Sequence, residues 1–401
     1  MRFMFDTDEA FSFETLRAVG YSVYGGADIG EVMATAGRIT PGDPDSWYQE
    51  WRALADRIAT IADKSAGDSH AASASSAYLR ASNYYRTAEF FLRDDPTNDP
   101  RVADTSARAI ATFRAAPEIQ ANWTRVGIPY EGIELEGYYL NSTGDEPGPT
   151  LLAHGGYDST VEELFFTMGE AARRRGWNCL IFEGPGQGTA LRVHKLPFRY
   201  DWEAVVTPVV DFAINLRGVD PDRIALIGMS MGGYLAPRAA AFEHRLAACI
   251  AYDGVFKMSA AFNQAATPPG SQLPEFDSEQ SNAALDRLIA HRSQLPSSQR
   301  WAVSNALWVF KSATAKEFIH EVSGYDLTGV ADQITCPTLV CQAENDQFFL
   351  GQPQMLYDAL RCPKTLMQFT AAEGAEEHCH VGALTLFHQR MFDWLDETLA
   401  S

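Results

Sequence analysis

Apolar residues in the first part of the chain recur at intervals of three and four positions, with aspartate or serine near the start of each run. This spacing places apolar side chains on one face of a helix, and the polar residues before it are typical of helix starts. We therefore expect residues 1–122 to form an all-helical domain. The runs with this pattern are FSFETLRAVGYSVYG (11–25), DSWYQEWRALADRIATIADKSAG (45–67), SAYLRASNYYRTAEFFLR (76–93) and DTSARAIATFRAA (104–116).

The pattern changes after residue 122. WTRVGIPY (123–130) and IELEGYYLN (133–141) alternate like two paired strands joined by a short turn. From there, apolar runs alternate with helical ones, which is typical of a parallel sheet covered by helices on both faces. We therefore predict an α/β domain with a mostly parallel, doubly wound sheet over residues 123–401. Its further strand-like runs are PTLLAHGGY, NCLIFEG, RIALIGMS, LAACIAYDGV, PTLVCQAEND and KTLMQF.

This alternation of strands and helices stops between about residues 256 and 330. PPGSQLPEFDSEQ (268–280) is rich in turn residues and predicts a loop. AALDRLIAHRSQL (283–295) and QRWAVSNALWVF (299–310) have helical spacing instead. The segment is therefore predicted to be a helical insertion on the sheet.

The charge balance bears on possible partners. Acidic residues outnumber basic ones 52 to 32, and the formal charge is -20. Such a field repels phosphate backbones and anionic lipid surfaces, which argues against nucleic acid or a membrane as partner. No apolar run reaches the length of a transmembrane helix, and MRFMFDTDEAFSFETL lacks the features of a signal peptide. We expect a cytoplasmic protein that acts on a small molecule.

Six cysteines are scattered along the chain without a C-x-x-C pair. In a reducing compartment they are expected to be free, mostly buried thiols. Cys379 lies between two histidines, so a nucleophilic role is an alternative to packing for this residue. Packing is favoured because a serine candidate exists elsewhere.

One serine has the sequence context of an enzymatic nucleophile. Ser230 stands in GMSMG, a G-x-S-x-G pattern that ends an apolar strand and precedes a helix. The turn in such a nucleophile elbow is so tight that side chains two residues either side of the serine would collide, and Gly228 and Gly232 remove that collision. We predict that Ser230 is the nucleophile.

A serine nucleophile needs a base to take its proton and a carboxylate to hold that base in the right tautomer. Asp346 follows the apolar run TLVCQA, at the tip of the strand after the insertion, where the acid is expected in this strand order. Glu344 lies earlier in the same segment and Asp332 lies before the strand. Both are expected to make surface or turn contacts instead.

The base is expected in the last loop, EGAEEHCHVGAL (373–384), which offers His378 and His380. His380 lies near the first turn of the final helix, whereas His378 remains on the loop, and this position favours His378. The H-x-H pair with Glu376 or Glu377 is an alternative metal site, but a further spaced ligand is missing. We therefore predict no metal and no cofactor.

The oxyanion formed by serine attack on a carbonyl needs two backbone donors. One is expected from the amide of Met231. The other is expected from the glycine turn in AHGGYDST, with Gly156 as first choice and Tyr157 as the alternative. Tyr157 is also a candidate for substrate binding. Asp253 ends another strand, and it is either a second substrate-binding candidate or a solvated loop residue.

The aromatic residues in NYYRTAEFF cover more than one face of an N-terminal helix. A buried helix that packs on its neighbours is the favoured explanation. The alternative is that Tyr84 or Tyr85 lines a substrate pocket.

Several of these stretches resemble a known family. GGYDSTVEE, FEGPGQG, GMSMGGYLAPRAAA, LAACIAYDGV, AEND and EEHCHVGA, together with the helical N-terminus, are similar to the α/β-hydrolases typified by 2,6-dihydroxypseudooxynicotine hydrolase and the fungal polyketide-shortening hydrolases of pigment biosynthesis. The resemblance implies the α/β-hydrolase fold, with the helical N-terminal domain and the insertion as caps over the site. It also implies Ser230 as nucleophile, Asp346 as acid and His378 as base, and it suggests a homodimer.

The resemblance further implies a serine hydrolase that cleaves a carbon–carbon bond next to a ketone through an acyl-enzyme. The pseudooxynicotine enzyme uses an extra glutamate downstream of its nucleophile, but VFKMSAAFN (255–263) contains no acid. This departure favours a different ketone or an ester. Ester or thioester hydrolysis and acyl transfer or cyclisation by the same triad are the enzymatic alternatives. A non-catalytic binding module is disfavoured by the complete set of serine, acid and histidine.

Overall fold

The computed structural model describes residues 4–266 and 278–400, and its centre is an eight-stranded sheet. The strand order is β1-β2-β4-β3-β5-β6-β7-β8, in which only β1–β2 and β2–β4 are antiparallel pairs. This mostly parallel sheet, flanked by helices, confirms the predicted α/β-hydrolase fold. The strands are β1 (Trp123–Tyr130), β2 (Ile133–Leu140), β3 (Gly148–His154), β4 (Asn178–Phe182), β5 (Val219–Met229), β6 (Ala248–Tyr252), β7 (Thr338–Ala343) and β8 (Lys364–Phe369).

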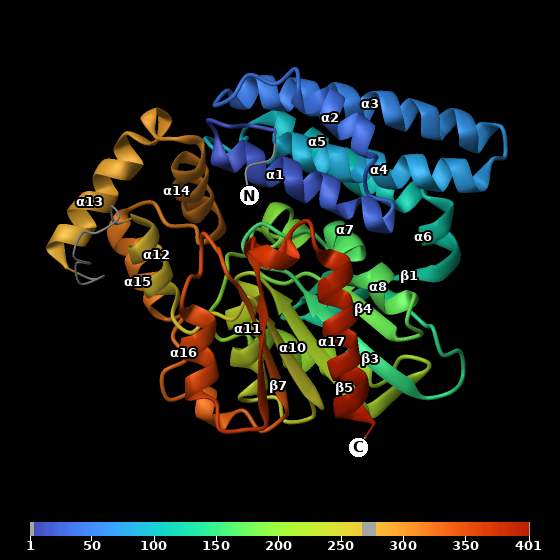
Figure 1. Ribbon diagram of the computed structural model, residues 1–401, viewed down its shortest axis with the longest axis vertical. Helices are drawn as coiled ribbons and strands as arrows, with labels where there is room; N and C mark the ends of the chain where they lie inside the picture. The colour runs from blue at the N-terminus through green and yellow to red at the C-terminus, as the bar shows by residue number, and fades with distance from the viewer. Residues whose placement is uncertain (1–3, 267–277, 401) are drawn as a thin grey trace.

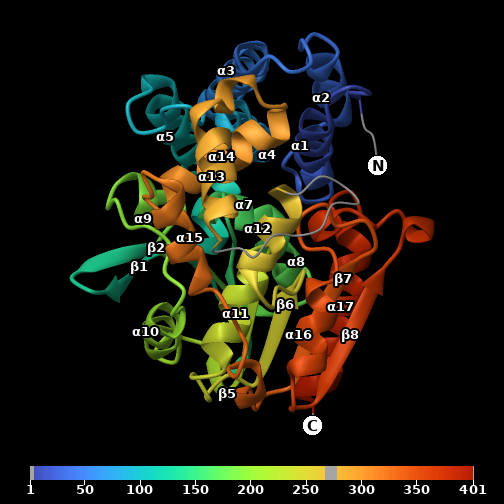
Figure 2. The ribbon, with the colours of Figure 1, turned by 90° about the vertical axis from the view of Figure 1, so that its left-hand side faces the viewer.

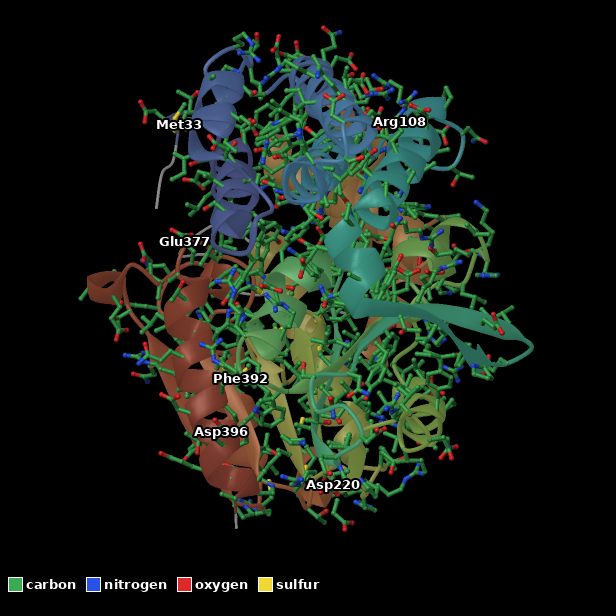
Figure 3. The ribbon with its side chains drawn as sticks, turned by 90° about the vertical axis from the view of Figure 1, so that its right-hand side faces the viewer. Met33, Arg108, Asp220, Glu377, Phe392 and Asp396 are labelled. Atoms are coloured by element: carbon green, nitrogen blue, oxygen red, sulfur yellow. The ribbon has the colours of Figure 1, made fainter. Side chains whose placement is uncertain are left out.

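A layer of helices precedes the sheet and lies across one end of it (Figure 1). Figure 3 labels Asp220, near the start of β5, at the opposite end of the molecule, so β5 runs toward this layer. The helices are α1 (Glu9–Gly20), η1 (Tyr21–Tyr24), α2 (Ile29–Ala36), α3 (Pro44–Gly67), α4 (Ala71–Glu89), α5 (Pro100–Ala115) and α6 (Pro117–Asn122).

Aspartate side chains cap the N-termini of four of these helices. Asp8, Asp28, Asp43 and Asp99 each accept a hydrogen bond from a backbone amide in the first turn of α1, α2, α3 and α5. Each cap satisfies an amide that has no partner within the helix, which contributes about 1 kcal/mol. The helical prediction for this segment is therefore supported by local capping as well as by apolar spacing.

Two groups of helices cover the two faces of the sheet. Buried apolar residues of α7, η2, α8 and α17 continue the core of the N-terminal helices over one face, while those of α10, α11 and α16 cover the other. None of the described helices has the length and apolar composition needed to cross a membrane. These helices and α9 are α7 (Val161–Leu164), η2 (Phe165–Gly169), α8 (Glu170–Arg173), α9 (Gly188–Arg192), α10 (Glu203–Ala213), α11 (Gly232–Ala240), α16 (Gln352–Ala359) and α17 (Leu384–Leu399).

The helical insertion is present between β6 and β7 and reaches the N-terminal helices (Figure 2). The ring of Trp301 stacks on Phe90 with centroids 4.6 Å apart, and its Nε1 donates to the Phe90 carbonyl at 3.0 Å. Most of the loop predicted at 268–280 lies outside the described residues. The insertion comprises α12 (Met258–Ala266), α13 (Glu279–Ala290), α14 (Ser297–Val309) and α15 (Ala315–Ser323).

A buried ionic network joins the N-terminal helices to the sheet. Arg17 of α1 and Arg86 of α4 donate to Asp158, after β3, at 2.8 and 2.6 Å. Arg17 also pairs with Glu163 of α7 at 2.6 Å, and Glu14 lies 3.4 Å from Arg86. A buried charge is tolerated only when it is paired, so each arginine depends on carboxylates from the other side of this boundary.

Replacing Arg86 with leucine should destabilise the protein strongly. Arg86→Leu leaves Asp158 and Glu14 with one buried cation fewer, and breaking a buried pair in this way costs about 3–5 kcal/mol of unfolding free energy. Arg38→Leu is the matched control, because Arg38 pairs with Glu50 at the surface and its loss should cost less than about 1 kcal/mol. Denaturant unfolding of both variants measures the difference, and equal losses would contradict this account of the network.

Candidate active site

Ser230 lies in a strained turn between β5 and α11. Its backbone has φ 62, a left-handed conformation that is uncommon for residues other than glycine. A Cβ on Gly228 would lie 2.1 Å from the Gly232 carbonyl oxygen, and one on Gly232 would lie 2.9 Å from the Gly155 oxygen. The structure therefore gives the physical reason for both glycines of the G-x-S-x-G pattern.

His378 lies between Ser230 and Asp346. Its Nε2 is 2.9 Å from the Ser230 Oγ, and its Nδ1 is 2.9 Å from Oδ2 of Asp346. The other oxygen of Asp346 accepts the amides of Phe348 and Phe349 at 2.7 and 3.0 Å, which fixes the carboxylate. The three side chains come from the ends of β5 and β7 and from the loop before α17, and they form a continuous hydrogen-bonded chain.

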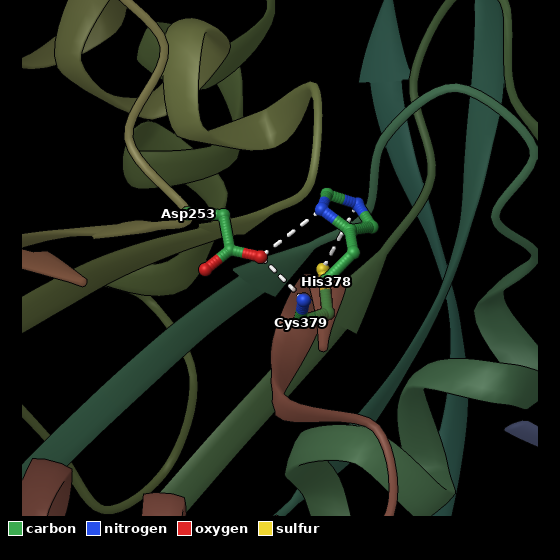
Figure 4. Close-up of side chains that lie close together, drawn as sticks. All are labelled: Asp253, His378 and Cys379. Carbon is green, nitrogen blue, oxygen red and sulfur yellow. Dashed lines mark hydrogen bonds and ion pairs between the residues drawn. The ribbon is translucent and has the colours of Figure 1, made fainter. Parts of the chain in front are cut away.

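A second carboxylate reaches the same imidazole. Asp253, directly after β6, places Oδ2 3.1 Å from Nδ1 of His378 and accepts the backbone amide of Cys379 (Figure 4). Its side chain is 0% exposed. Asp253 is therefore buried behind His378 and does not line the pocket described below, so the structure does not place it at the position expected for substrate binding.

His380 has different surroundings. Its ring stacks on Phe369 with centroids 3.8 Å apart, and Nδ1 is 3.3 Å from the Ala375 carbonyl oxygen. Its Nε2 faces the other oxygen of Asp253 at 3.6 Å. Of the two histidines in the last loop, His378 is thus the one beside Ser230.

Burial and charge set the protonation states here. Burial alone would lower the pKa of His378, but Asp346, Cys379 and Asp253 together raise it well above the usual value. Burial opposes ionisation of Asp253, yet the facing imidazoles of His380 and His378 hold its pKa below the usual range. Burial lowers the pKa of His380. Burial also raises the pKa of the Cys379 thiol to about 12, which disfavours this thiol as a nucleophile at neutral pH.

Donor atoms of Asp253, His378 and Cys379 all lie within 4.8 Å of one another, a spacing that a metal ion could use. Oδ2 of Asp253 already accepts the Cys379 amide, and Nε2 of His378 already contacts Ser230. A metal would have to compete with both contacts. The geometry therefore fits a proton-transfer site better than a metal site.

The loop after β3 approaches the elbow closely enough to supply a second oxyanion donor. The amide of Gly156 donates to the Ser159 hydroxyl at 3.0 Å, so this first choice of donor is already engaged. Among the described residues, the amides of Tyr157 and Met231 have no hydrogen-bond acceptor. Gln187 holds the loop through a bond from Nε2 to the Gly155 carbonyl at 2.7 Å. Tyr157, the alternative donor, is therefore the better placed.

A pocket of about 160 Å³ opens beside Ser230 and His378, where the N-terminal helices, the insertion and the sheet meet. Tyr157 lines it, and the Tyr157 hydroxyl donates to the Ala302 carbonyl of α14 at 3.1 Å. Figure 3 labels Glu377, directly before His378, between the N-terminal helices and α17. The pocket wall is mostly apolar, and its aromatic rings include Phe13, Phe90, Phe91, Phe262, Trp301 and Phe348.

The two other tyrosine candidates lie elsewhere. The hydroxyl of Tyr84 donates to Glu31 at 2.8 Å, and that of Tyr85 donates to Asp56 at 2.6 Å. Both rings are buried within the N-terminal helices and neither lines the pocket. The favoured explanation, helix packing, therefore describes their positions.

Helix α1 supplies pocket residues that the sequence did not identify. Phe13, Glu14 and Arg17 line the pocket, and the Phe13 ring lies 6.4 Å from that of His378. In the sequence, Glu14 and Arg17 look like the solvent face of an amphipathic helix. The only local signal was the apolar density of FSFETL, which predicts a helix but not what it covers.

Comparisons with known proteins agree with this architecture. Residues 150–384 match the alpha/beta hydrolase family, and the chain belongs to it. The 20-hydroxy-prefusarin hydrolase of Gibberella moniliformis is 35% identical over 410 residues, which cover 97% of this chain and 96% of that protein. Hydrolase acrC of Aspergillus aculeatus is 33% identical over 98% of both chains. The resemblance to fungal hydrolases is thereby confirmed.

A solved structure shows the same fold over nearly the whole chain. The crystal structure of 2,6-dihydroxy-pseudo-oxynicotine hydrolase superimposes with a TM-score of 0.73 at 23% identity, covering 95% of each chain. The shared fold includes the region of the N-terminal helices. Together with the family match and the 35% identical relative, this makes the chain an enzyme of the alpha/beta hydrolase superfamily.

Adding one methyl group at Gly156 should disable the site. A Cβ there would lie 2.7 Å from both the Met229 oxygen and the Met231 nitrogen, so Gly156→Ala pushes the elbow away from its neighbour loop. The displaced loop carries the Tyr157 amide, the second candidate oxyanion donor. We therefore expect the rate of labelling by a fluorophosphonate to fall by about 10² or more, as on loss of one such donor. Gly67→Ala is the control, because its Cβ meets nothing within 4 Å and its rate should stay unchanged. Unchanged labelling of Gly156→Ala would contradict the assigned contact.

Proposed function

We propose that this protein is a serine hydrolase that works through an acyl-enzyme on Ser230. The observation that supports the proposal most is the hydrogen-bonded chain from Ser230 through His378 to Asp346, at 2.9 Å for each step. Nε2 of His378 can take the hydroxyl proton while Asp346 holds the Nδ1 proton, which is the arrangement required for nucleophilic attack.

The proposed reaction has two halves. Ser230 Oγ attacks a carbonyl carbon as its proton moves to His378, and the amides of Met231 and Tyr157 bind the oxyanion. Collapse of this intermediate breaks the bond to the leaving carbon, which takes the proton from His378 and departs as a ketone or phenol. Water then attacks the acyl-enzyme, gives its proton to His378, and releases a carboxylic acid and free Ser230.

We further propose an oxygenated aromatic or polyketide-like ketone as substrate, with cleavage of the carbon–carbon bond beside it. A carbon leaving group must carry negative charge during cleavage, so the substrate is expected to be delocalised and therefore flat. Flat molecules pack well against the aromatic rings of the pocket wall. Glu14, Arg17 and Asp158 add hydrogen-bonding groups to the same wall. A relative named for action on 20-hydroxy-prefusarin, at 35% identity, supports a substrate of secondary metabolism.

The substrate class can be tested with an aryl β-diketone and a phenyl ester of matched acyl chain. The proposal predicts that the diketone yields one carboxylic acid and one ketone per turnover, detected by liquid chromatography, and that Ser230→Ala yields neither. If only the ester is cleaved, the carbon–carbon step is wrong and the serine mechanism stands. If neither product forms from any ketone, ester or thioester offered, the hydrolase proposal is wrong.

The activity should rise with pH, and this rise should occur at a higher pH than the usual pKa of histidine would give. His378 must be neutral to accept the serine proton. Its pKa is raised well above the usual range of a histidine, so the neutral form appears only at higher pH. The acid limb of the kcat/KM profile should therefore have its midpoint above about 6.5. A midpoint at or below that pH would show that the carboxylates around His378 do not stabilise its charged form in solution.

A further inference from the structure

Two carboxylates approach one nitrogen of the candidate base, whereas a serine triad needs only one. Nδ1 of His378 is 2.9 Å from Oδ2 of Asp346 and 3.1 Å from Oδ2 of Asp253. The two aspartates follow β7 and β6, which are adjacent parallel strands, so their tips converge at the same edge of the sheet. Two carboxylate oxygens thus lie within hydrogen-bond distance of the same imidazole nitrogen.

Asp253 combines an unfavourable backbone conformation with a fully buried charged side chain. Its backbone has φ 60, in the left-handed region, and a Cβ on Gly233 would lie 2.2 Å from its carbonyl oxygen. Its side chain is 0% exposed, and Oδ1 has no hydrogen-bond partner in the part of the chain that the structure describes, with His380 Nε2 the facing group at 3.6 Å. A buried carboxylate of this kind is tolerated when a nearby cation offsets its desolvation, and the imidazolium of His378 is the group positioned to do so.

We propose that Asp253 is a second orienting carboxylate for His378, which shares the Nδ1 proton with Asp346 and stabilises the imidazolium formed when Ser230 loses its proton. The inference rests on the serine hydrolase function proposed above. Asp253 reaches the reacting atoms only through His378, so it is a positioning residue. No atom of Asp253 needs to contact the substrate for this role.

Few other charged groups bear on His378 in the described part of the chain. The Cys379 thiol lies 3.4 Å from Nε2, and Glu376 and Glu377 precede His378 on its own loop. From α1, and from the segment after β7, aromatic rings pack against the imidazole, and Glu14 and Arg17 lie on the same pocket wall. Asp253 and Asp346 are therefore the carboxylates in direct contact whose removal should act on the imidazole.

The test compares pH profiles of fluorophosphonate labelling for intact protein and for Asp253→Asn. Loss of this carboxylate destabilises the imidazolium, so neutral His378 becomes available at lower pH. The acid limb should move down by about one pH unit or more. Asp332→Asn is the matched control, since Asp332 is exposed and lies before β7, and its profile should equal that of the wild type. A folded Asp253→Asn protein with a wild-type profile would overturn the proposal.

Asp346→Asn gives a second measurement that does not depend on the folding of the first variant. Removing a lone orienting aspartate costs about 10⁴ in rate. Because Asp253 still holds Nδ1, we expect Asp346→Asn to lose less than about 10³, and addition of Asp253→Asn to remove most of the remainder. A full loss in the single variant would refute the shared role. Failure of the wild-type protein to label would instead refute the serine hydrolase proposal.

Discussion

The hydrogen bond between His378 and Ser230 is the contact on which the rest of the structure depends, because it requires the end of β5 and the loop before α17, which are distant in the chain, to meet. A mostly parallel sheet brings the carboxyl ends of β5, β6 and β7 to the same edge, and the loop before α17 returns to that edge. The elbow then lifts Ser230 toward the imidazole. Each local feature, from the glycines of the elbow to the amides that fix Asp346, limits how far this contact can vary.

Burial strengthens the electrostatic interactions around this contact. The N-terminal helices and the insertion meet over the sheet edge and leave a mostly apolar pocket with many aromatic rings in its wall. Charges in such surroundings interact more strongly than in water, which favours proton transfer but makes every unpaired charge costly. The ionic network of Arg17 and Arg86 is consistent with that constraint, because each of these buried arginines from the covering helices is paired with Asp158.

Sequence reasoning reached furthest where the candidate site depends on local order. The strand-turn-helix context led to Ser230 as a candidate, and the succession of strands led to Asp346 and the last loop. The structure brings these residues together, because strand ends in a parallel sheet must converge. The same logic predicted the helical N-terminus and the insertion. It favoured His378 over His380 from their positions relative to the final helix. The structure adds the physical difference, because the His380 ring stacks on Phe369.

The remaining site residues depend on contacts between segments far apart in the chain. Glu14 and Arg17 resemble surface residues until α1 is packed over the pocket, whereas Tyr84 and Tyr85 satisfy their hydroxyls within their own helical layer. Because it ends a strand, Asp253 was predicted to be either a substrate-binding residue or a solvated loop residue. It is buried instead, and its partners come from the last loop. The Gly156 amide was a reasonable donor until the bond to Ser159 was known.

The central claim is that Ser230 is the nucleophile, and the most direct measurement is to map by peptide mass spectrometry the residue that a fluorophosphonate modifies. The account predicts an adduct on Ser230 in the wild type and in Cys379→Ala, and none in Ser230→Ala. An adduct on another residue of the folded protein, or no adduct while a control serine hydrolase is labelled, would contradict it.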